Sequence, residues 1–423
     1  MRRCRPPLNI YYGKRMSKKL TIFVHHASEC LTDHESHGDG LICFSLLNGL
    51  AERGHQIYAY ADTAPIKTCN PNLHVKTGQH RVPANSLAPW EQAWRADRWL
   101  KELTREQPID LVWRMHPYGV GCPAVPHTGG RPLVVGPLFY NWPEQPGGTP
   151  KSGRPRLGVG LQSIVSPIAA RGWQRTLSQA ALTLCATGPH TALVQEQYPG
   201  AEVMELPVIV EPPPSTEGRT ARGKADGGGK RVALLFVANL VPNKNPMVFC
   251  ETIQLLRASG IDAIGTLLGD GPEREPLESY CAQVGMKNAV GFLGKVPNSE
   301  VYQRLAEADY LVSASHGEPY GRGIAEAMSV GTPAVCHRSG GPADFIEDGG
   351  DGLLVSELTA AAYAERIEQA LADPGAWKRL SQNAQRKAEK WRSEVVLDHL
   401  EAALLSTVQR AATAKTEKNV SNV

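Results

Sequence analysis

Residues 315–355 read SHGEPYGRGIAEAMSVGTPAVCHRSGGPADFIEDGGDGLLV. Two glutamates, Glu318 and Glu326, flank a glycine-rich turn that leads into a helix-forming run beginning at Ile324. A turn that opens a helix presents backbone N–H groups without intrahelical partners, together with the positive end of the helix dipole. Such a helix start binds anionic oxygens, and phosphate in particular. The segment therefore predicts a site in which backbone donors hold a phosphate while two carboxylates bind hydroxyl groups beside it.

Phosphate and hydroxyl groups occur together in a sugar nucleotide, and this segment resembles the donor site of the retaining family 4 glycosyltransferases, which have the GT-B fold. The ordered motifs of the resemblance span residues 233–355, whereas in the first half it is only topological. It implies a hexosyltransferase that moves a sugar, with retention, from a nucleotide sugar to an acceptor hydroxyl in glycan, glycolipid or polysaccharide biosynthesis. The expected donor is a UDP- or GDP-sugar, and the expected acceptor is a glycan, a lipid-linked sugar or a small molecule.

The resemblance assigns roles to individual residues of the second half. Glu326 is expected to accept hydrogen bonds from the ribose hydroxyls, and Glu318 to contact a hydroxyl of the transferred sugar. Lys244, in the segment FVANLVPNKNP, stands where the family has a lysine that contacts phosphate. Asn239 stands where the family has an arginine, so one fixed charge is missing from the expected phosphate clamp.

Two further segments of the second half match the family in order and spacing. Gly340 and Gly341 precede a second expected helix start, similar to the double glycine of the family near the donor phosphates. Phe292 and Leu293 would line the base pocket, largely through their backbone. As single residues, Phe292 and Leu293 fit ordinary core and turn positions better than a base pocket.

In the first half, three residues are candidates for contact with the donor. Gly38 and Gly40 stand between the first expected strand and its helix, where a plain turn is the alternative interpretation. His116 follows the strand-like run DLVWRM and resembles a family histidine that touches the transferred sugar, with a structural histidine as the alternative. The expected catalytic residues are Glu318, His116 and Lys244. The expected donor-binding residues are Glu326, Asn239, Tyr320, Gly321, Arg322, Gly323, Ile324, Gly38, Gly40, Phe292, Leu293, Gly340 and Gly341.

Both halves alternate short apolar runs with longer periodic segments, which predicts parallel sheets covered by helices on both faces. The run Leu41–Arg53 has helical spacing and ends at a glycine stop. The strands expected in the first half are Leu20–His26, Gln56–Ala61, Asp110–Met115, Pro132–Gly136 and Leu182–Thr187. Those of the second half are Val232–Val237, Ala263–Leu268, Ala289–Gly294, Tyr310–Ser315, Thr332–Cys336 and Gly352–Val355. The fold class is therefore α/β, with two Rossmann-like, doubly wound domains that face a cleft.

The 423 residues favour two domains over one. A Gly-rich, charged stretch with few apolar residues marks the boundary between them. In GT-B enzymes the last helix crosses back to the first domain, and we expect the same here. The expected division is 1–17 disordered lead, 18–207 acceptor-binding domain, 208–230 linker, 231–392 donor-binding domain, 393–412 terminal helix and 413–423 polar tail.

Composition and cysteine pattern indicate the cellular compartment of the protein. Hydrophobic residues make up 42% of the chain and charged residues 21%, as in a soluble globular protein. No apolar run is long enough to span a membrane, the opening segment lacks the apolar core of a secretory signal, and the nine cysteines form no CxxC pair. These features predict a cytoplasmic protein with reduced thiols.

Basic residues exceed acidic ones in the first half, which suits an anionic acceptor or the inner face of a membrane. An ordinary solvated surface explains the excess equally well. Residues 145–195 contain the apolar run LGVGLQSIV and no acidic residue, which suits a lipid-linked or anionic acceptor at a membrane surface. A mobile loop with ordinary charge is the alternative. The basic residues of this segment are Lys151, Arg154, Arg156, Arg171 and Arg175.

Other functions were weighed against glycosyl transfer. A catalytically silent nucleotide-sugar-binding scaffold is the main alternative, because Asn239 replaces the family arginine. An NAD-dependent oxidoreductase is disfavoured because no third glycine follows Gly38 and Gly40 at dinucleotide-binding spacing. A glycosidase needs its two carboxyls about 5–9.5 Å apart, whereas eight residues of helix span roughly 12 Å. No acidic metal-binding motif ends a strand, so we expect no metal. We also expect no cofactor and no nucleic-acid partner.

Overall fold

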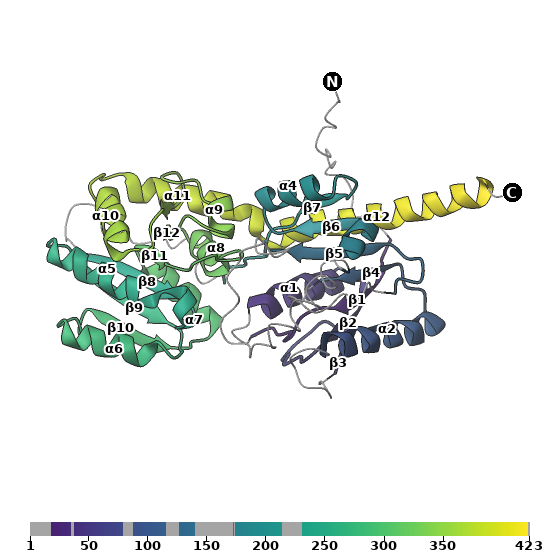
Figure 1. Cartoon of the computed structure of the whole chain (residues 1–423), viewed down its shortest axis with the longest axis horizontal. Coiled ribbons are helices and arrows are strands. Elements are labelled where there is room, and N and C mark those ends of the chain that lie inside the picture. The colour runs from purple at the N-terminus through teal and green to yellow at the C-terminus, as the bar shows by residue number, and fades with distance from the viewer. Residues whose placement is uncertain are drawn as a thin grey trace, which may run out of the picture.

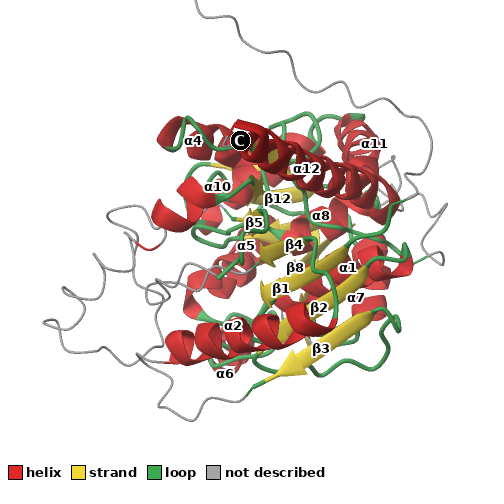
Figure 2. Cartoon of the chain, turned by 90° about the vertical axis from the view of Figure 1, so that its right-hand side faces the viewer, coloured by secondary structure: helices red, strands yellow, loops and turns green. Residues whose placement is uncertain are grey.

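The computed structural model describes residues 18–34, 38–78, 88–115, 127–139, 172, 174–213 and 231–421. Two units, each built around an open parallel sheet, lie side by side along the long axis of the molecule (Figure 1). In each unit the strands form a central layer between helices (Figure 2).

The first unit contains a seven-stranded sheet in the order β3-β2-β1-β4-β5-β6-β7. Every neighbouring pair of strands is parallel. Its strands are β1 Thr21–His26, β2 Gln56–Ala61, β3 Leu73–Thr77, β4 Leu111–Arg114, β5 Leu133–Leu138, β6 Leu182–Cys185 and β7 Val203–Glu205.

The second unit contains a six-stranded parallel sheet in the order β10-β9-β8-β11-β12-β13. Its strands are β8 Arg231–Val237, β9 Asp262–Leu268, β10 Val290–Gly294, β11 Tyr310–Ser313, β12 Ala334–His337 and β13 Leu353–Val355. In both sheets the first strand of the unit lies inside the sheet and the order reverses beside it. Ligands of doubly wound sheets bind at this reversal, beyond the carboxyl ends of the strands.

The helices that cover the sheets of the first unit are α1 Gly38–Glu52, α2 Ala88–Glu106 and α4 Gly188–Gln197. Those of the second unit and the crossover are α5 Pro246–Ala258, α6 Arg274–Gln283, α7 Asn298–Glu307, α8 Arg322–Ser329, α9 Gly341–Phe345, α10 Ala360–Leu371, α11 Ala376–Ala388 and α12 Ser393–Ser421, with the 3₁₀ turns η2 Pro242–Lys244 and η3 Glu389–Trp391.

The expected α/β class with two Rossmann-like units is confirmed, and each expected strand is present. Two strands were missed, β3 and β7. Both lie at sheet edges and are largely accessible to solvent, so their sequences do not show the continuous apolar character of a buried parallel strand.

The last helix, α12, leaves the second unit and packs along the first, as expected (Figure 1). His55 Nε2 lies 2.9 Å from Glu401 Oε1, and Arg53 Nη1 donates to Glu401 Oε2 at 3.1 Å. A side chain at Gly49 of α1 would meet Leu397, so the two helices approach closely there. The helix continues to Ser421, past residue 412 where a polar tail was expected. Alanine, lysine and glutamate after residue 412 propagate a helix that is already nucleated.

A second connection between the units follows β7. Val210 N–H donates to the carbonyl of Trp391 at 2.9 Å, and Ser393 N–H donates to Glu211 Oε2 at 2.9 Å. The outgoing and returning segments of the chain therefore lie in contact. Of the expected linker, 208–213 are described and 214–230 lie outside the described residues. Among the described helices, none combines the length and the apolar character that a membrane crossing requires.

Candidate functional site at the carboxyl edge of the second sheet

Lys244 and Glu318 meet although 74 residues separate them. Lys244 ends the 3₁₀ turn η2 after β8, and Glu318 lies in the loop after β11. Because β8 and β11 are parallel neighbours, their carboxyl ends open at the same edge, and the Lys244 ammonium forms an ion pair with Glu318 Oε2. The side chains are 22% and 19% exposed, so this pair remains within reach of a ligand.

Backbone and side-chain hydrogen bonds hold the two loops together. His316 N–H donates to the carbonyl of Asn243 at 3.1 Å, and Asn245 Nδ2 donates to the carbonyl of Ala314 at 2.9 Å. Asn245 adopts a left-handed conformation with φ 46°, which ends η2 and begins α5. The position of Lys244 is thus fixed by the loop in which Glu318 lies.

Glu326 lies one helical turn after Arg322 in α8, and Arg322 Nε donates to Glu326 Oε1 at 2.9 Å. The Glu326 side chain is only 6% exposed, so the guanidinium compensates a nearly buried carboxylate. Arg322 Nη1 is also buried and has no hydrogen-bond partner among the described residues. The two glutamates therefore differ, since Glu318 pairs with Lys244 and Glu326 with Arg322.

Gly321 caps the start of α8 with φ 91°, a conformation that favours glycine. The first N–H groups of α8 have no partner within the helix. The helix begins at Arg322, shortly after Glu318 in the chain. Gly323 follows in the first turn, where an added Cβ would meet only the carbonyl oxygen of Val237, at 3.7 Å. The start of α8 therefore also lies close to the end of β8.

The loop after β12 closes on the backbone of Glu318. Gly341 N–H donates to the Glu318 carbonyl at 2.8 Å. Gly340 has φ 66° and ψ −155°, and a Cβ there would overlap the same carbonyl oxygen. This backbone region is nearly exclusive to glycine. The helix that follows, α9, has only five residues, so the dipole of α8 contributes more to the field at this edge.

Two of the expected donor-binding residues direct their side chains into the core. Tyr320 is 4% exposed, its hydroxyl accepts from Val208 N–H at 3.3 Å, and its ring packs 5.4 Å from that of Phe345. Ile324 is 2% exposed. Burial raises the pKa of the Tyr320 phenol, which stays neutral. At both positions only the backbone is left to contact a ligand.

The expected base-pocket residues lie further along the same sheet edge. Phe292 is partly buried, its carbonyl accepts from Arg274 Nη2 at 3.3 Å, and Leu293 is 44% exposed. Asn239 is exposed in the loop after β8, where Leu240 N–H donates to the carbonyl of Asp270 at 3.0 Å. The residues expected to bind the base thus lie at the end of β10, those expected to bind phosphate and sugar follow β8 and β11, and Gly340 and Gly341 follow β12 at the same edge.

The first unit contributes less to the described site. Gly38 and Gly40 lie in the first turn of α1, which begins three residues earlier than expected; Gly40 is buried, and a Cβ at Gly38 would meet nothing within 4 Å. His116 lies outside the described residues, as does the basic cluster of 145–195 apart from Arg175, which is exposed.

One polar contact between the units was missed by the sequence analysis. Thr187, at the start of α4, donates from its hydroxyl to Asp344 Oδ2 at 2.6 Å. Burial raises the pKa of Asp344, although the hydrogen bond from Thr187 opposes this effect. A cavity of about 230 Å³ adjoins the contact and is lined by Glu205, Lys387 and Trp391 among others. This cavity lies apart from Lys244 and Glu318, which do not line it. No sequence signal could have paired these distant residues.

Comparison with known proteins bears directly on this edge. The model of the glycosyl transferases group 1 matches residues 219–387. This part of the chain belongs to the glycosyl transferases group 1. The lipopolysaccharide core biosynthesis glycosyltransferase LpsE of Rhizobium meliloti (strain 1021) is 39% identical over 116 residues, which cover 27% of this chain and 34% of LpsE. The chain thus matches about a third of the length of that relative.

Solved structures resemble the chain well beyond the group 1 region. Sucrose-phosphate synthase from Thermosynechococcus elongatus superposes with a TM-score of 0.66 at 16% identity, covering 93% of this chain and 100% of the other. Anabaena HepE in complex with UDP gives a TM-score of 0.65 at 18% identity, covering 92% and 100%. At this level of identity the likeness concerns the fold, and the chain has the GT-B fold that was expected.

Proposed function

We propose that this chain is a retaining glycosyltransferase that moves a hexose from a nucleotide sugar to an acceptor hydroxyl. One observation carries the proposal: the ion pair of Lys244 and Glu318 beside the start of α8, at the carboxyl edge of a group 1 unit. A cation and free N–H groups suit a leaving diphosphate, while the adjoining carboxylate suits a sugar hydroxyl.

Each residue of the proposed donor site would have a distinct role. Lys244 and the N–H groups of α8 stabilise the negative charge that grows on the diphosphate as the glycosidic bond breaks. Glu318 accepts a hydrogen bond from a hydroxyl of the transferred sugar. Glu326 accepts hydrogen bonds from the ribose hydroxyls through Oε2, the oxygen to which Arg322 Nε does not donate. Arg322 Nη1, buried and without a partner among the described residues, is a further donor for the nucleotide. The leaving phosphate takes the proton of the acceptor hydroxyl, which attacks from the same face.

The partners follow from the same assignment. A UDP-sugar is favoured as donor because HepE, of similar fold, was solved with UDP, and a GDP-sugar is the alternative. We propose that 231–392 bind the donor and 18–207 bind the acceptor, a glycan, lipid-linked sugar or small molecule. The relative LpsE is named for lipopolysaccharide core biosynthesis, which supports a glycan or glycolipid product and work at the inner face of a membrane.

Donor hydrolysis without acceptor tests the proposal. The intact chain is incubated with UDP- and GDP-sugars, and the free sugar and nucleotide are measured. Slow release of both is expected. A silent scaffold, which Asn239 in place of the family arginine would favour, binds the nucleotide sugar but releases nothing above the Glu318→Gln variant.

Glu318→Gln and Glu326→Gln are expected to separate the two carboxylates. Ribose contacts persist in the product nucleotide, so Glu326→Gln should weaken binding of the nucleoside diphosphate about tenfold, through loss of a charge-assisted hydrogen bond. Glu318→Gln should lower kcat far more than it lowers that affinity, because its partner belongs to the reacting group. Calorimetric titration and steady-state kinetics measure the two effects.

Glu300→Gln is the matched control for these variants. Glu300 also pairs with an arginine four residues away, at 3.2 Å from Arg304, but in α7, where its side chain is 37% exposed. It should change neither property. Weaker nucleoside diphosphate binding in Glu318→Gln than in Glu326→Gln would mean that the two roles are exchanged.

Turnover is expected to persist in excess EDTA, because Lys244 and the start of α8 supply fixed positive charge at the phosphate site. The measurement compares initial rates with and without the chelator, on protein dialysed against it beforehand. Loss of activity that magnesium or manganese restores would show that the diphosphate leaves with a divalent ion.

A further inference from the structure

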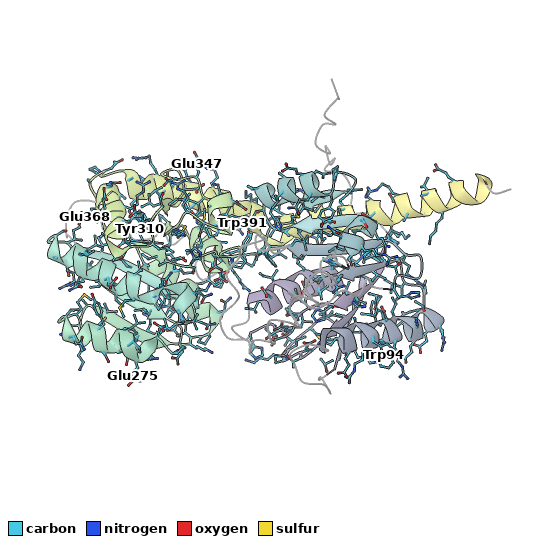
Figure 3. The ribbon with its side chains drawn as sticks, viewed as in Figure 1. Trp94, Glu275, Tyr310, Glu347, Glu368 and Trp391 are labelled. Atoms are coloured by element: carbon cyan, nitrogen blue, oxygen red, sulfur yellow. The ribbon has the colours of Figure 1, made fainter. Side chains whose placement is uncertain are left out.

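The outer face of α2 carries an unusual row of side chains. Trp94, Arg98, Lys101 and Arg105 are all exposed, and their spacing of four, three and four residues places them on one stripe of the helix. Trp94 is 61% exposed, and it points away from the first unit at its outer edge (Figure 3). We call these four residues the α2 stripe.

The opposite face of α2 accounts for the folding role of this helix. Ala93, Ala96, Leu100 and Leu103 are buried against the first sheet, and Trp99 packs edge-on to Phe23 with ring centroids 5.3 Å apart. The α2 stripe takes no part in this packing. Trp94 contacts only the Arg98 guanidinium among the aromatic and cationic contacts of the described residues, at 5.9 Å from its ring centroid.

Cations outnumber carboxylates beside the stripe, where the carboxylates are Glu102 and the exposed Glu106. Lys76 of β3 is 49% exposed and adds a fourth cation beside the α2 stripe. Glu102 lies within ion-pair distance of both Lys76 and Arg98, at 3.8 and 3.1 Å, whereas no ion pair is formed by Lys101 or Arg105 within the described residues. A basic row without an aromatic residue is commonly a solvated surface, but an exposed tryptophan at its end is uncommon.

We propose that the α2 stripe docks the first unit onto an anionic lipid surface. Tryptophan combines a large apolar ring with a polar N–H and is favoured at the membrane interface, and lysine and arginine are drawn to anionic headgroups. The stripe lies on the convex, outward face of a helix, a shape that suits a plane better than a peptide or a folded partner. A nucleic acid would share only the attraction to the cations.

The position of α2 indicates which part of the first unit such docking would bring to the lipid. The helix follows β3, so its first turns lie toward the carboxyl edge of the first sheet, where ligands of this fold bind. Trp94 lies in these first turns and Arg105 in the last. Docking through the α2 stripe would bring the acceptor side of the unit near the lipid. This inference rests on the proposed function only in the identity of a lipid-linked acceptor, since vesicle binding needs no donor.

Co-sedimentation with vesicles tests the inference on the intact chain. Binding is expected to vesicles of equal parts phosphatidylcholine and phosphatidylglycerol, to be absent with phosphatidylcholine alone, and to weaken as salt rises. Trp94→Ala should lower the partition constant about tenfold through loss of apolar burial. Lys101→Ala combined with Arg105→Ala should lower it about 25-fold, at about fivefold per cation.

Two matched variants control for loss of charge and of apolar surface in general. Lys378 and Arg386 lie on the exposed face of α11, which carries basic residues without an exposed large apolar one, so their double alanine variant should bind as the parent does. Leu255→Ala removes a 39% exposed side chain of α5 and should likewise have no effect. Thermal unfolding checks that each variant is folded.

The inference is overturned if the parent does not bind anionic vesicles or if Trp94→Ala binds them as well as the parent does. It is also overturned if the α11 variant loses as much binding as the Lys101 and Arg105 variant. Binding to nucleic acid without vesicle binding would assign the stripe to a different partner and also overturn it. Donor hydrolysis in solution should be unchanged in the α2 variants, so failure of the transferase proposal would be seen separately.

Discussion

Lys244→Ala is expected to lower kcat/KM about ten- to a hundredfold, because a charge-assisted hydrogen bond contributes about 1.5–3 kcal/mol. Asn239 cannot replace the lost charge at the proposed phosphate site. The substitution also leaves Glu318 without its cation, at an edge where the proposed donor brings further negative charge. Both effects act on the same step, so the loss should appear in kcat as well as in nucleotide affinity.

Lys287→Ala is the control for the removal of a lysine from the second unit, because Lys287 is exposed on the loop before β10 and forms no ion pair within the described residues. The double variant Lys244→Ala/Glu318→Gln completes a cycle that measures the coupling of the pair. An unchanged kcat/KM in Lys244→Ala would place the phosphate site elsewhere and contradict the proposed donor site.

Gly340→Ala is expected to destabilise the fold by about 2–4 kcal/mol, because the methyl group meets both a glycine-only backbone conformation and the carbonyl oxygen of Glu318. Relief of the overlap must displace either the loop after β12 or the backbone of Glu318. Donor affinity should therefore fall along with stability. Urea unfolding and nucleotide titration measure the two effects.

Gly323→Ala is the matched control, since both glycines belong to the expected donor site but differ in their surroundings. Gly323 lies in the first turn of α8, and its Cβ would make only an ordinary contact at 3.7 Å. Alanine favours a helix over glycine by about 1 kcal/mol, so the variant should be as stable as the parent or more so. Equal stability of Gly340→Ala and the parent would contradict the role assigned to Gly340.

The fold could be predicted from the sequence because parallel strands buried on both faces are continuous apolar runs, as in Leu20–His26 and Val232–Val237. β3 and β7 have no such signal, since each lies at a sheet edge and is largely accessible to solvent. The pair of Arg322 and Glu326 was not predicted, because the helix was expected to begin at Ile324, whereas α8 begins at Arg322 and so places the two residues one turn apart.

Other contacts depend on strand order, which no local pattern contains. Lys244 reaches Glu318 only because β11 lies beside β8, and Thr187 reaches Asp344 only because the two units pack together. Family resemblance supplied the first of these as two separate residues, but not as an ion pair. It also could not indicate that the Tyr320 ring turns away from the edge to anchor Val208.

The two passages of the chain between the units touch each other, through Val210 with Trp391 and Ser393 with Glu211. These backbone contacts would resist sliding of the two units past each other, whereas rotation of one unit about the crossing would mainly have to break the Thr187 to Asp344 hydrogen bond. Rotation about the crossing is therefore the relative motion that we expect between the units. A probe pair placed across the molecule far from the crossing should report this rotation as a change in distance.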